Sequence, residues 1–287
     1  MHALKRIAMP LVVLALALTA PAGAMDPEAP TEPVLLPGSA LAQGGLVRGQ
    51  VAPGTRVWRG ERELQVDARG RFVTGLHRDD PAELVLRLRL PDGSEQRSTF
   101  GVRQRAYDEQ RIDGLPGGMV TPPEDVLARI RAEQERVNAA RSHETAMDAA
   151  FDGFIWPVTG TITSVYGSRR ILNGEPRQPH YGIDIAASRG TPIRATAAGI
   201  VRMADADLYY TGGTVIIDHG HGVSSTYLHM ASLDVAVGDE VARGARIGTV
   251  GATGRVTGPH LCFRYNWFDK RLDPALLLPE AQPDDGA

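Results

Sequence analysis

The 287-residue sequence contains a single cysteine, Cys262, and almost no net charge. One cysteine cannot form an internal disulfide, so the fold must be stabilised by its own apolar core. The 31 basic and 34 acidic residues give a formal net charge of −3, and they form no basic stripe of the kind that binds nucleic acid. No polybasic or amphipathic membrane segment follows residue 24. We therefore expect no nucleic-acid partner and no membrane span beyond that residue.

Residues 1–24 have the layout of a secretory signal peptide. Lys5 and Arg6 precede an apolar stretch from Ile7 to Leu18, and Ala22-Gly-Ala24 ends the segment with small residues. The apolar stretch is too short to span a bilayer. An uncleaved anchor or a core helix fits the Ala-x-Ala ending less well. We expect export across the inner membrane to the periplasm.

The remaining chain is long enough for two domains. Residues 25–33 are rich in Pro, Glu and Ala and are expected to be disordered, as is a tail at 277–287. Residues 34–105 contain short alternating runs separated by turn signals, which predicts a small β-sandwich-like accessory domain of immunoglobulin-like type. A binding or positioning module is the preferred interpretation, and a plain spacer is the alternative.

Residues 106–152 are predicted to form a loop and a connector helix. Thr121-Pro-Pro-Glu124 combines a capping box with proline at the first helical position. Four apolar residues then recur at helical spacing, in a pattern that extends to about Ala150: Val126, Leu127, Ile130 and Val137.

Residues 153–276 are predicted to contain sequential strands with glycine turns and no intervening helix. This pattern favours antiparallel sheets. The expected fold is mainly β, with a sandwich-like N-terminal domain, a connector helix and a C-terminal antiparallel sheet.

Three short segments of this C-terminal part carry metal-ligand and proton-transfer side chains. They are His180-Tyr-Gly-Ile-Asp184, Tyr227-Leu-His229 and Gly258-Pro-His260-Leu-Cys262. Imidazole and carboxylate both bind Zn²⁺, and positions 260 and 262 of a strand share one face. Each histidine by itself is more often a surface or core residue, but five such side chains beside Gly and Pro indicate a zinc hydrolase.

In these motifs and their order the chain resembles the M23 peptidases, the lysostaphin or LytM type of zinc endopeptidase that cuts peptidoglycan. The family motifs are His-x-x-x-Asp, Tyr-x-His and Gly-Pro-His-x-His. The resemblance covers about residues 155–275, and further landmarks fall in register: Gly190-Thr-Pro192, Ala198-Gly-Ile-Val201 and Gly212-Gly-Thr-Val215. It implies an M23-type peptidase core within residues 153–276, one zinc ion per chain and peptidoglycan peptide stems or cross-links as substrate.

The chain departs from the family pattern at Cys262, which occupies the position of the last zinc-ligating histidine. Thiolate is itself a good zinc ligand. It adds a second anionic ligand, so the Lewis acidity of the metal should fall, and we expect a weaker hydrolase or an altered metal preference. The alternative is that Cys262 is a small buried apolar residue.

The resemblance assigns zinc ligation to His180, Asp184 and Cys262 and proton transfer to His229 and His260. One of the two histidines would accept a proton from the attacking water, and the other would donate a hydrogen bond to the developing oxyanion. Sequence does not say which histidine does which.

Three further residues are candidates for substrate binding. Tyr227 should share a strand face with His229, where it either adds a hydroxyl to the oxyanion site or packs, with packing preferred. Asn173 and Tyr210 lie in predicted loops that could border the groove, although ordinary surface loops are an equal alternative. A second His-x-His pair, His219 and His221, follows an apolar run and precedes a glycine, which indicates a structural hairpin turn.

Two functions are consistent with the sequence. The first is a periplasmic zinc endopeptidase of peptidoglycan. The second is a catalytically weak or inactive M23-like protein that binds cell wall or activates another wall hydrolase. Four of the five site residues match the family and the fifth is still a donor, which favours the enzyme.

Overall fold

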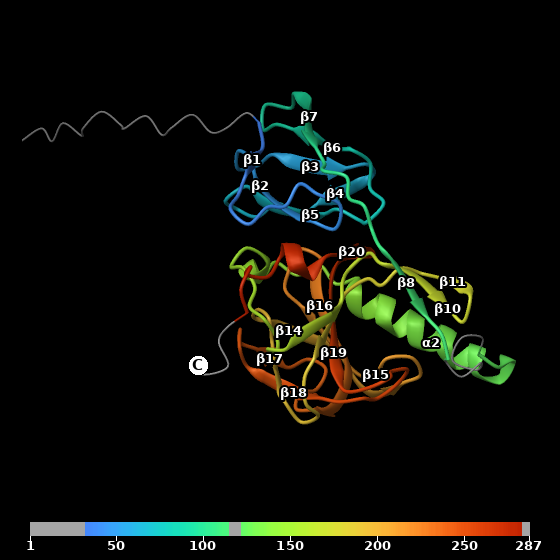
Figure 1. The fold of residues 1–287 in the computed structure, drawn as a ribbon. Coiled ribbons are helices and arrows are strands. Elements are labelled where there is room, and N and C mark those ends of the chain that lie inside the picture. Colours follow the sequence, from blue (N-terminus) through green and yellow to red (C-terminus); the bar gives the residue numbers. More distant parts are fainter. Residues whose placement is uncertain (1–31, 115–121, 283–287) are drawn as a thin grey trace, which may run out of the picture.

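The computed structural model describes residues 32–114 and 122–282. The expected signal peptide and Thr121 of the expected capping box lie outside the described residues. Figure 1 shows small N-terminal sheets above a large C-terminal sheet, along which the long helix α2 (Glu124–Arg141) lies. This is the mainly β arrangement predicted from the sequence. No helix among the described residues is long and apolar enough to cross a membrane.

Two small antiparallel sheets form the N-terminal part. Their strand orders are β1-β2-β5 and β4-β3-β6-β7. The strands are β1 (Val34–Leu35), β2 (Leu46–Gln50), β3 (Arg56–Arg59), β4 (Arg62–Leu64), β5 (Arg71–Gly75), β6 (Glu83–Arg89) and β7 (Glu95–Gly101). Strand β6 alternates as its sequence predicts and buries Leu84, Leu86 and Leu88 in the core.

The N-terminal part packs directly on the C-terminal part. The Arg48 Nε atom on β2 donates to the Ala150 carbonyl oxygen at 2.7 Å. Gly75 at the end of β5 lies so close to Trp267 that a Cβ atom there would be 2.5 Å from the tryptophan Cβ. A side chain at position 75 would therefore disrupt this interface.

The segment between the two parts forms a strand as well as a helix. Strand β8 (Glu109–Ile112) pairs in parallel with β10 (Arg169–Leu172), which forms a hairpin with β11 (Glu175–Arg177). The prediction that the helix extends to about Ala150 was wrong, because α2 ends at Arg141.

Tertiary contacts explain this earlier end of the helix. The chain after α2 runs over the turn that follows β15 (Gly212–Asp218), where the His221 N–H donates to the Thr145 carbonyl oxygen at 2.9 Å. The Thr145 hydroxyl also lies 3.1 Å from an Asp218 carboxylate oxygen. A single 3₁₀ turn, η1 (Asp148–Ala150), then leads into the C-terminal sheet.

The C-terminal sheet is antiparallel, in the order β17-β14-β15-β16-β19-β12-β9, with β13, β18 and β20 attached at its sides. The strands are β9 (Thr161–Ser164), β12 (Ile183–Ala186), β13 (Pro192–Arg194), β14 (Gly199–Leu208), β15 (Gly212–Asp218), β16 (Val223–Leu233), β17 (Glu240–Val241), β18 (Arg246–Val250), β19 (His260–Trp267) and β20 (Lys270–Leu272). One face of its centre packs in the main core, and α2 packs on β14 and β15.

The end of the C-terminal domain lies further along the chain than the sequence indicated. Residues 277–282, assigned above to a disordered tail, follow η2 (Pro274–Leu276) and pack against the core. Leu278 is buried, and the Gln282 side chain exchanges hydrogen bonds of 2.8 and 2.9 Å with the Gly160 backbone.

Candidate metal centre

Strand register places two of the predicted metal ligands directly opposite each other. Asp184 on β12 pairs with Cys262 on β19, so both side chains leave the same face of the sheet. His260, two residues before Cys262, shares this face. His180 comes from the loop that leads into β12.

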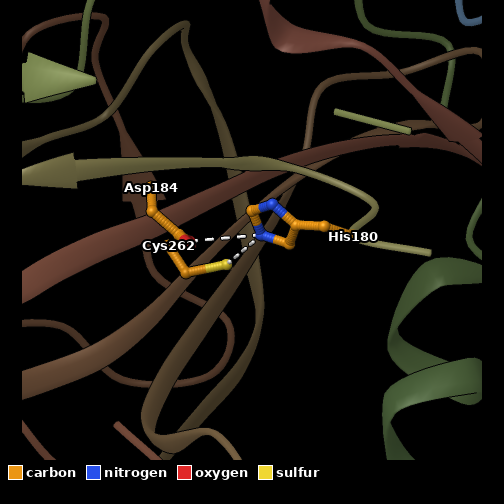
Figure 2. Close-up of side chains that lie close together, drawn as sticks. All are labelled: His180, Asp184 and Cys262. Carbon is orange, nitrogen blue, oxygen red and sulfur yellow. Dashed lines mark hydrogen bonds and ion pairs between the residues drawn. The ribbon is translucent and has the colours of Figure 1, made fainter. Parts of the chain in front are cut away.

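The three candidate ligands converge on one point. The His180 Nε2 atom lies 3.2 Å from Asp184 Oδ1 and 3.4 Å from Cys262 Sγ, and Figure 2 shows the three side chains facing one another. The three donor atoms all lie within 4.8 Å of one another. The structure thus brings together donors that are close enough to share one metal ion, although His180 and Cys262 lie 82 residues apart in the sequence.

The glycine between the first two ligands is required by this geometry. A Cβ atom on Gly182 would lie 2.5 Å from the Phe263 carbonyl oxygen and 2.6 Å from Arg264 Cγ. Only glycine allows β12 to approach β19 this closely. The motif therefore fixes the spacing of the ligands as well as their chemistry.

The donor set fits zinc. Asp184 Oδ1 is buried, and its polar neighbours are the Nε2 atoms of His180 and His260, 3.2 and 3.8 Å away, so it faces the other candidate site residues rather than a separate structural partner. The His180 Nδ1 atom lies 2.9 Å from the Ser164 hydroxyl oxygen, an outer contact that directs Nε2 toward the other two donors. One imidazole, one carboxylate and one thiol are all established zinc ligands.

Charges around the centre favour an ionised carboxylate. Burial acts to raise the pKa of Asp184, but the surrounding histidines and Arg170 hold that pKa below its usual range. The Arg170 Nη2 atom lies 3.4 Å from Asp184 Oδ2, the oxygen that faces away from His180. Burial acts to lower the pKa of His180, yet Cys262 and Asp184 beside it raise that pKa. A bound cation would compete with the proton on this imidazole.

The two predicted proton-transfer residues lie side by side next to the centre. The rings of His229 and His260 are 4.9 Å apart, and His260 Nε2 is 3.8 Å from Asp184 Oδ1. The Nδ1 atoms lie 2.9 Å from the carbonyl oxygens of Thr253 and Gly258, respectively. A carbonyl oxygen only accepts, so each Nδ1 carries a proton that it donates to that oxygen.

Burial sets the charge of His229. It lowers the pKa of His229 to about 4, so this imidazole is neutral at pH 7. A neutral imidazole with a free Nε2 can accept a proton, as a general base must.

Tyr227 lies on the opposite side of the sheet from His229. Strand β16 carries an extra residue between Tyr227 and Met230 relative to β15, and His229 has a left-handed φ of 65°. This bulge breaks the alternation on which the expectation of a shared face rested. The Tyr227 side chain is fully buried and its hydroxyl accepts from the Thr196 N–H at 2.9 Å, so it packs in the core.

The two loop candidates lie in different surroundings. Tyr210 lies in the turn between β14 and β15, and its carbonyl oxygen accepts from the Arg255 N–H at 2.9 Å. That contact joins it to the loop that holds His229 through Thr253. Asn173 is exposed at the tip of the β10–β11 hairpin, with a positive φ of 49°.

The second His-x-His pair occupies the hairpin turn between β15 and β16, as predicted. Both His219 nitrogens are engaged, Nδ1 with the Ala198 carbonyl at 2.7 Å and Nε2 with the Ser225 hydroxyl at 2.8 Å. The His221 Nδ1 atom lies 3.3 Å from the Gln65 carbonyl oxygen in the N-terminal part. Because both nitrogens of His219 are engaged, this histidine has no free nitrogen for a metal ion.

Sequence reasoning missed three polar residues around the centre. Ser164 orients His180, and Arg170 contacts Asp184. Arg264 lies two residues after Cys262 on the same strand, so strand periodicity could have placed it on the face of the site. No comparable signal marks Ser164 or Arg170, whose positions depend on the pairing of β9 and β10 with distant strands.

Comparison with known proteins matches residues 178–274 to peptidase family M23. Vibrio cholerae peptidoglycan DD-endopeptidase ShyA is 43% identical over 101 residues, which are 35% of this chain and 23% of ShyA. Neisseria meningitidis DD-carboxypeptidase/endopeptidase Mpg is 40% identical over 129 residues, which are 44% of this chain and 30% of Mpg.

A solved structure extends the similarity beyond the matched residues. A Pseudomonas aeruginosa protein assigned to peptidase M23 superposes with a TM-score of 0.65 and 29% identity, over 82% of this chain and 94% of the other. Residues 178–274 of the chain belong to the M23 peptidase family. The chain spans 23% and 30% of the length of the two curated relatives named above.

Proposed function

We propose that this protein is a zinc metallopeptidase that hydrolyses peptide bonds in peptidoglycan. The observation that carries the proposal is the convergence of His180, Asp184 and Cys262 beside the paired imidazoles of His229 and His260. Sequence similarity to peptidoglycan DD-endopeptidase ShyA supports the choice of substrate class.

The chain supplies both the metal ligands and the proton-transfer groups. When bound, zinc would act as a Lewis acid that polarises the scissile carbonyl and lowers the pKa of water. The neutral His229 presents a lone pair at Nε2, and the Nδ1 atom of His260 is held by the Gly258 carbonyl oxygen beside it. One accepts the proton of the attacking water, and the other, once protonated, donates a hydrogen bond to the developing oxyanion.

Activity should be lower than that of a centre with two histidines and one aspartate. Cys262 adds a second anionic ligand, which lowers the Lewis acidity of a bound metal. Arg170 forms an ion pair with Asp184, which makes this carboxylate a weaker metal ligand. These two features favour a second candidate function, a weak or inactive relative that binds cell wall or activates another wall hydrolase.

Metal analysis combined with digestion of isolated sacculi separates these functions. Protein purified without chelator should contain about one zinc per chain and should release soluble peptide fragments, identified by mass spectrometry. His260→Ala is the matched control, because it should keep the metal and lose most of the cleavage. Absence of stoichiometric metal would refute the proposal that the protein is a zinc peptidase. Zinc without cleavage, together with cosedimentation on sacculi, would establish the second function.

We also propose that the protein works in the periplasm, on the basis of the signal-peptide layout of residues 1–24. Release of the protein by osmotic shock, alongside a periplasmic marker, tests this. Retention with a cytoplasmic marker would refute it.

A further inference from the structure

Three arginines converge on the sheet face that carries the metal centre. Arg264 lies on β19 two residues beyond Cys262, so its side chain leaves the same face. Arg271 on β20 pairs with Asn266, the next residue of β19 on that face. Arg141, at the end of α2, reaches down to the Thr226 hydroxyl at 3.4 Å, and Thr226 is the register partner of Arg264.

No carboxylate of the described residues is paired with these positive charges. Within the described part of the chain, none of Arg141, Arg264 and Arg271 forms an ion pair. Arg141 is only 6% exposed, and its Nε atom and that of Arg264 are buried without hydrogen-bond partners. Burial, and then the charges of Arg271 and Arg264, lower the pKa of Arg141. A guanidinium stays charged in proteins, so a bound anion would offset the mutual repulsion and the burial of these three charges.

A cavity of about 100 Å³ opens among these side chains. It is lined by all three arginines, by Leu228 and Tyr210, and by Glu133 from α2. The Glu133 carboxylate is already engaged, with Arg129 Nε at 2.6 Å and the Tyr209 N–H at 2.8 Å. The space exceeds what one water needs and suits a small anionic group.

The cavity adjoins the metal centre. Leu228 lines the cavity and is the register partner of Cys262. Arg264 lies two strand residues from Cys262, a separation of about 7 Å. An extended peptide running along β19 covers the same distance in two residues. A carboxylate in the cavity would therefore belong to a residue within about two positions of the bond at the metal centre.

We infer that Arg264, Arg141 and Arg271 form an anion subsite that binds a carboxylate of the peptide substrate. The inference rests on the proposed function for the identity of that substrate. Stem peptides of peptidoglycan carry free carboxylates at the D-glutamyl, diaminopimelyl and C-terminal residues. Guanidinium groups bind carboxylates through two parallel hydrogen bonds, which gives the subsite both affinity and orientation.

Calorimetric titration with synthetic stem tetrapeptides tests the subsite. The probes are the peptide with all carboxylates free and three analogues, each with one carboxylate converted to an amide. At least one analogue should bind the wild-type protein about tenfold more weakly than the free peptide. Arg264→Gln should reduce this preference to less than about threefold. Arg97→Gln, at an exposed arginine of β7, is the matched control and should keep it.

A fold readout accompanies the titration. Arg264→Gln removes a half-buried charge that has no ion-pair partner among the described residues, so its thermal midpoint should equal or exceed that of the wild type. Equal affinities for all four peptides, or a preference that persists in a folded Arg264→Gln protein, would overturn the inference. Digestion of sacculi without carboxylate preference would refute the subsite and leave the proposed function standing. An arginine-dependent preference without digestion of sacculi would support the subsite and refute the proposed peptidase activity.

Discussion

Replacing Cys262 by serine should remove most of the stabilisation of the fold by zinc. A metal that binds only the folded protein adds about 2.7 kcal/mol at a hundredfold excess over its dissociation constant. For a chain of this size that corresponds to a rise of about 5–10 °C in the thermal midpoint. Cys262 Sγ is 3.4 Å from His180 Nε2, and a hydroxyl in its place is a poor zinc ligand. The zinc-induced rise should shrink to about 2 °C or less.

The zinc-free fold should tolerate this change. Cys262 is 2% exposed, but a serine hydroxyl there can hydrogen bond to His180, so the free energy of unfolding should fall by only about 1 kcal/mol. Differential scanning fluorimetry of chelator-treated protein, with and without added zinc, measures both effects. Ser224→Ala is the control, because Ser224 is buried on the same sheet face away from the donors. An unchanged zinc response in Cys262→Ser would rule out thiolate ligation.

Cys262→His tests the same position by replacing the thiol with the zinc ligand that the family has there. Imidazole would restore the family ligand and remove an anion from the metal centre, so sacculus digestion should increase. If Cys262 is only a buried apolar residue, the larger ring would overpack the strand and lower the thermal midpoint instead. Digestion that stays unchanged or falls, with a destabilised fold, would contradict the ligand role.

His229→Ala and His260→Ala should each keep zinc and reduce sacculus digestion by about a hundredfold, with non-additive effects in the double variant; equal rates for all three proteins would show that the pair is structural. Burial lowers the pKa of His219 to about 4, below the value of about 6.5 in the unfolded chain, so the unfolded state binds the proton more readily between these values. Stability should therefore fall as the pH drops from about 6.5 to 4, by up to about 3 kcal/mol from this residue, and urea unfolding of His219→Gln should show a weaker pH dependence in that window. Gly75→Ala would place a methyl group 2.5 Å from a side-chain atom of β19 and should cost about 1–3 kcal/mol in urea unfolding, whereas Gly101→Ala, with no neighbour within 4 Å, should cost less; equal losses would argue against tight docking of the N-terminal sheets.

Local patterns in the sequence carried the chemistry of the candidate centre. The motif around His180 and Asp184 places two ligands four residues apart with a glycine between them, and the structure shows why that glycine must lack a side chain. Strand periodicity correctly placed His260 and Cys262 on one face. The mainly β class followed from alternation and turn residues, because both are properties of neighbouring residues.

Only tertiary structure decided which other side chains meet at the centre. The left-handed backbone at His229 turned this residue away from the face of Tyr227, an outcome that alternation alone cannot predict. Arg141 and Arg264 come together across more than 120 residues because α2 packs on the same sheet face that carries the metal ligands. The types of the candidate metal ligands can therefore be predicted from short motifs. The charged residues around these ligands, and the sheet face on which each residue lies, depend on strand register and helix packing, which no local pattern encodes.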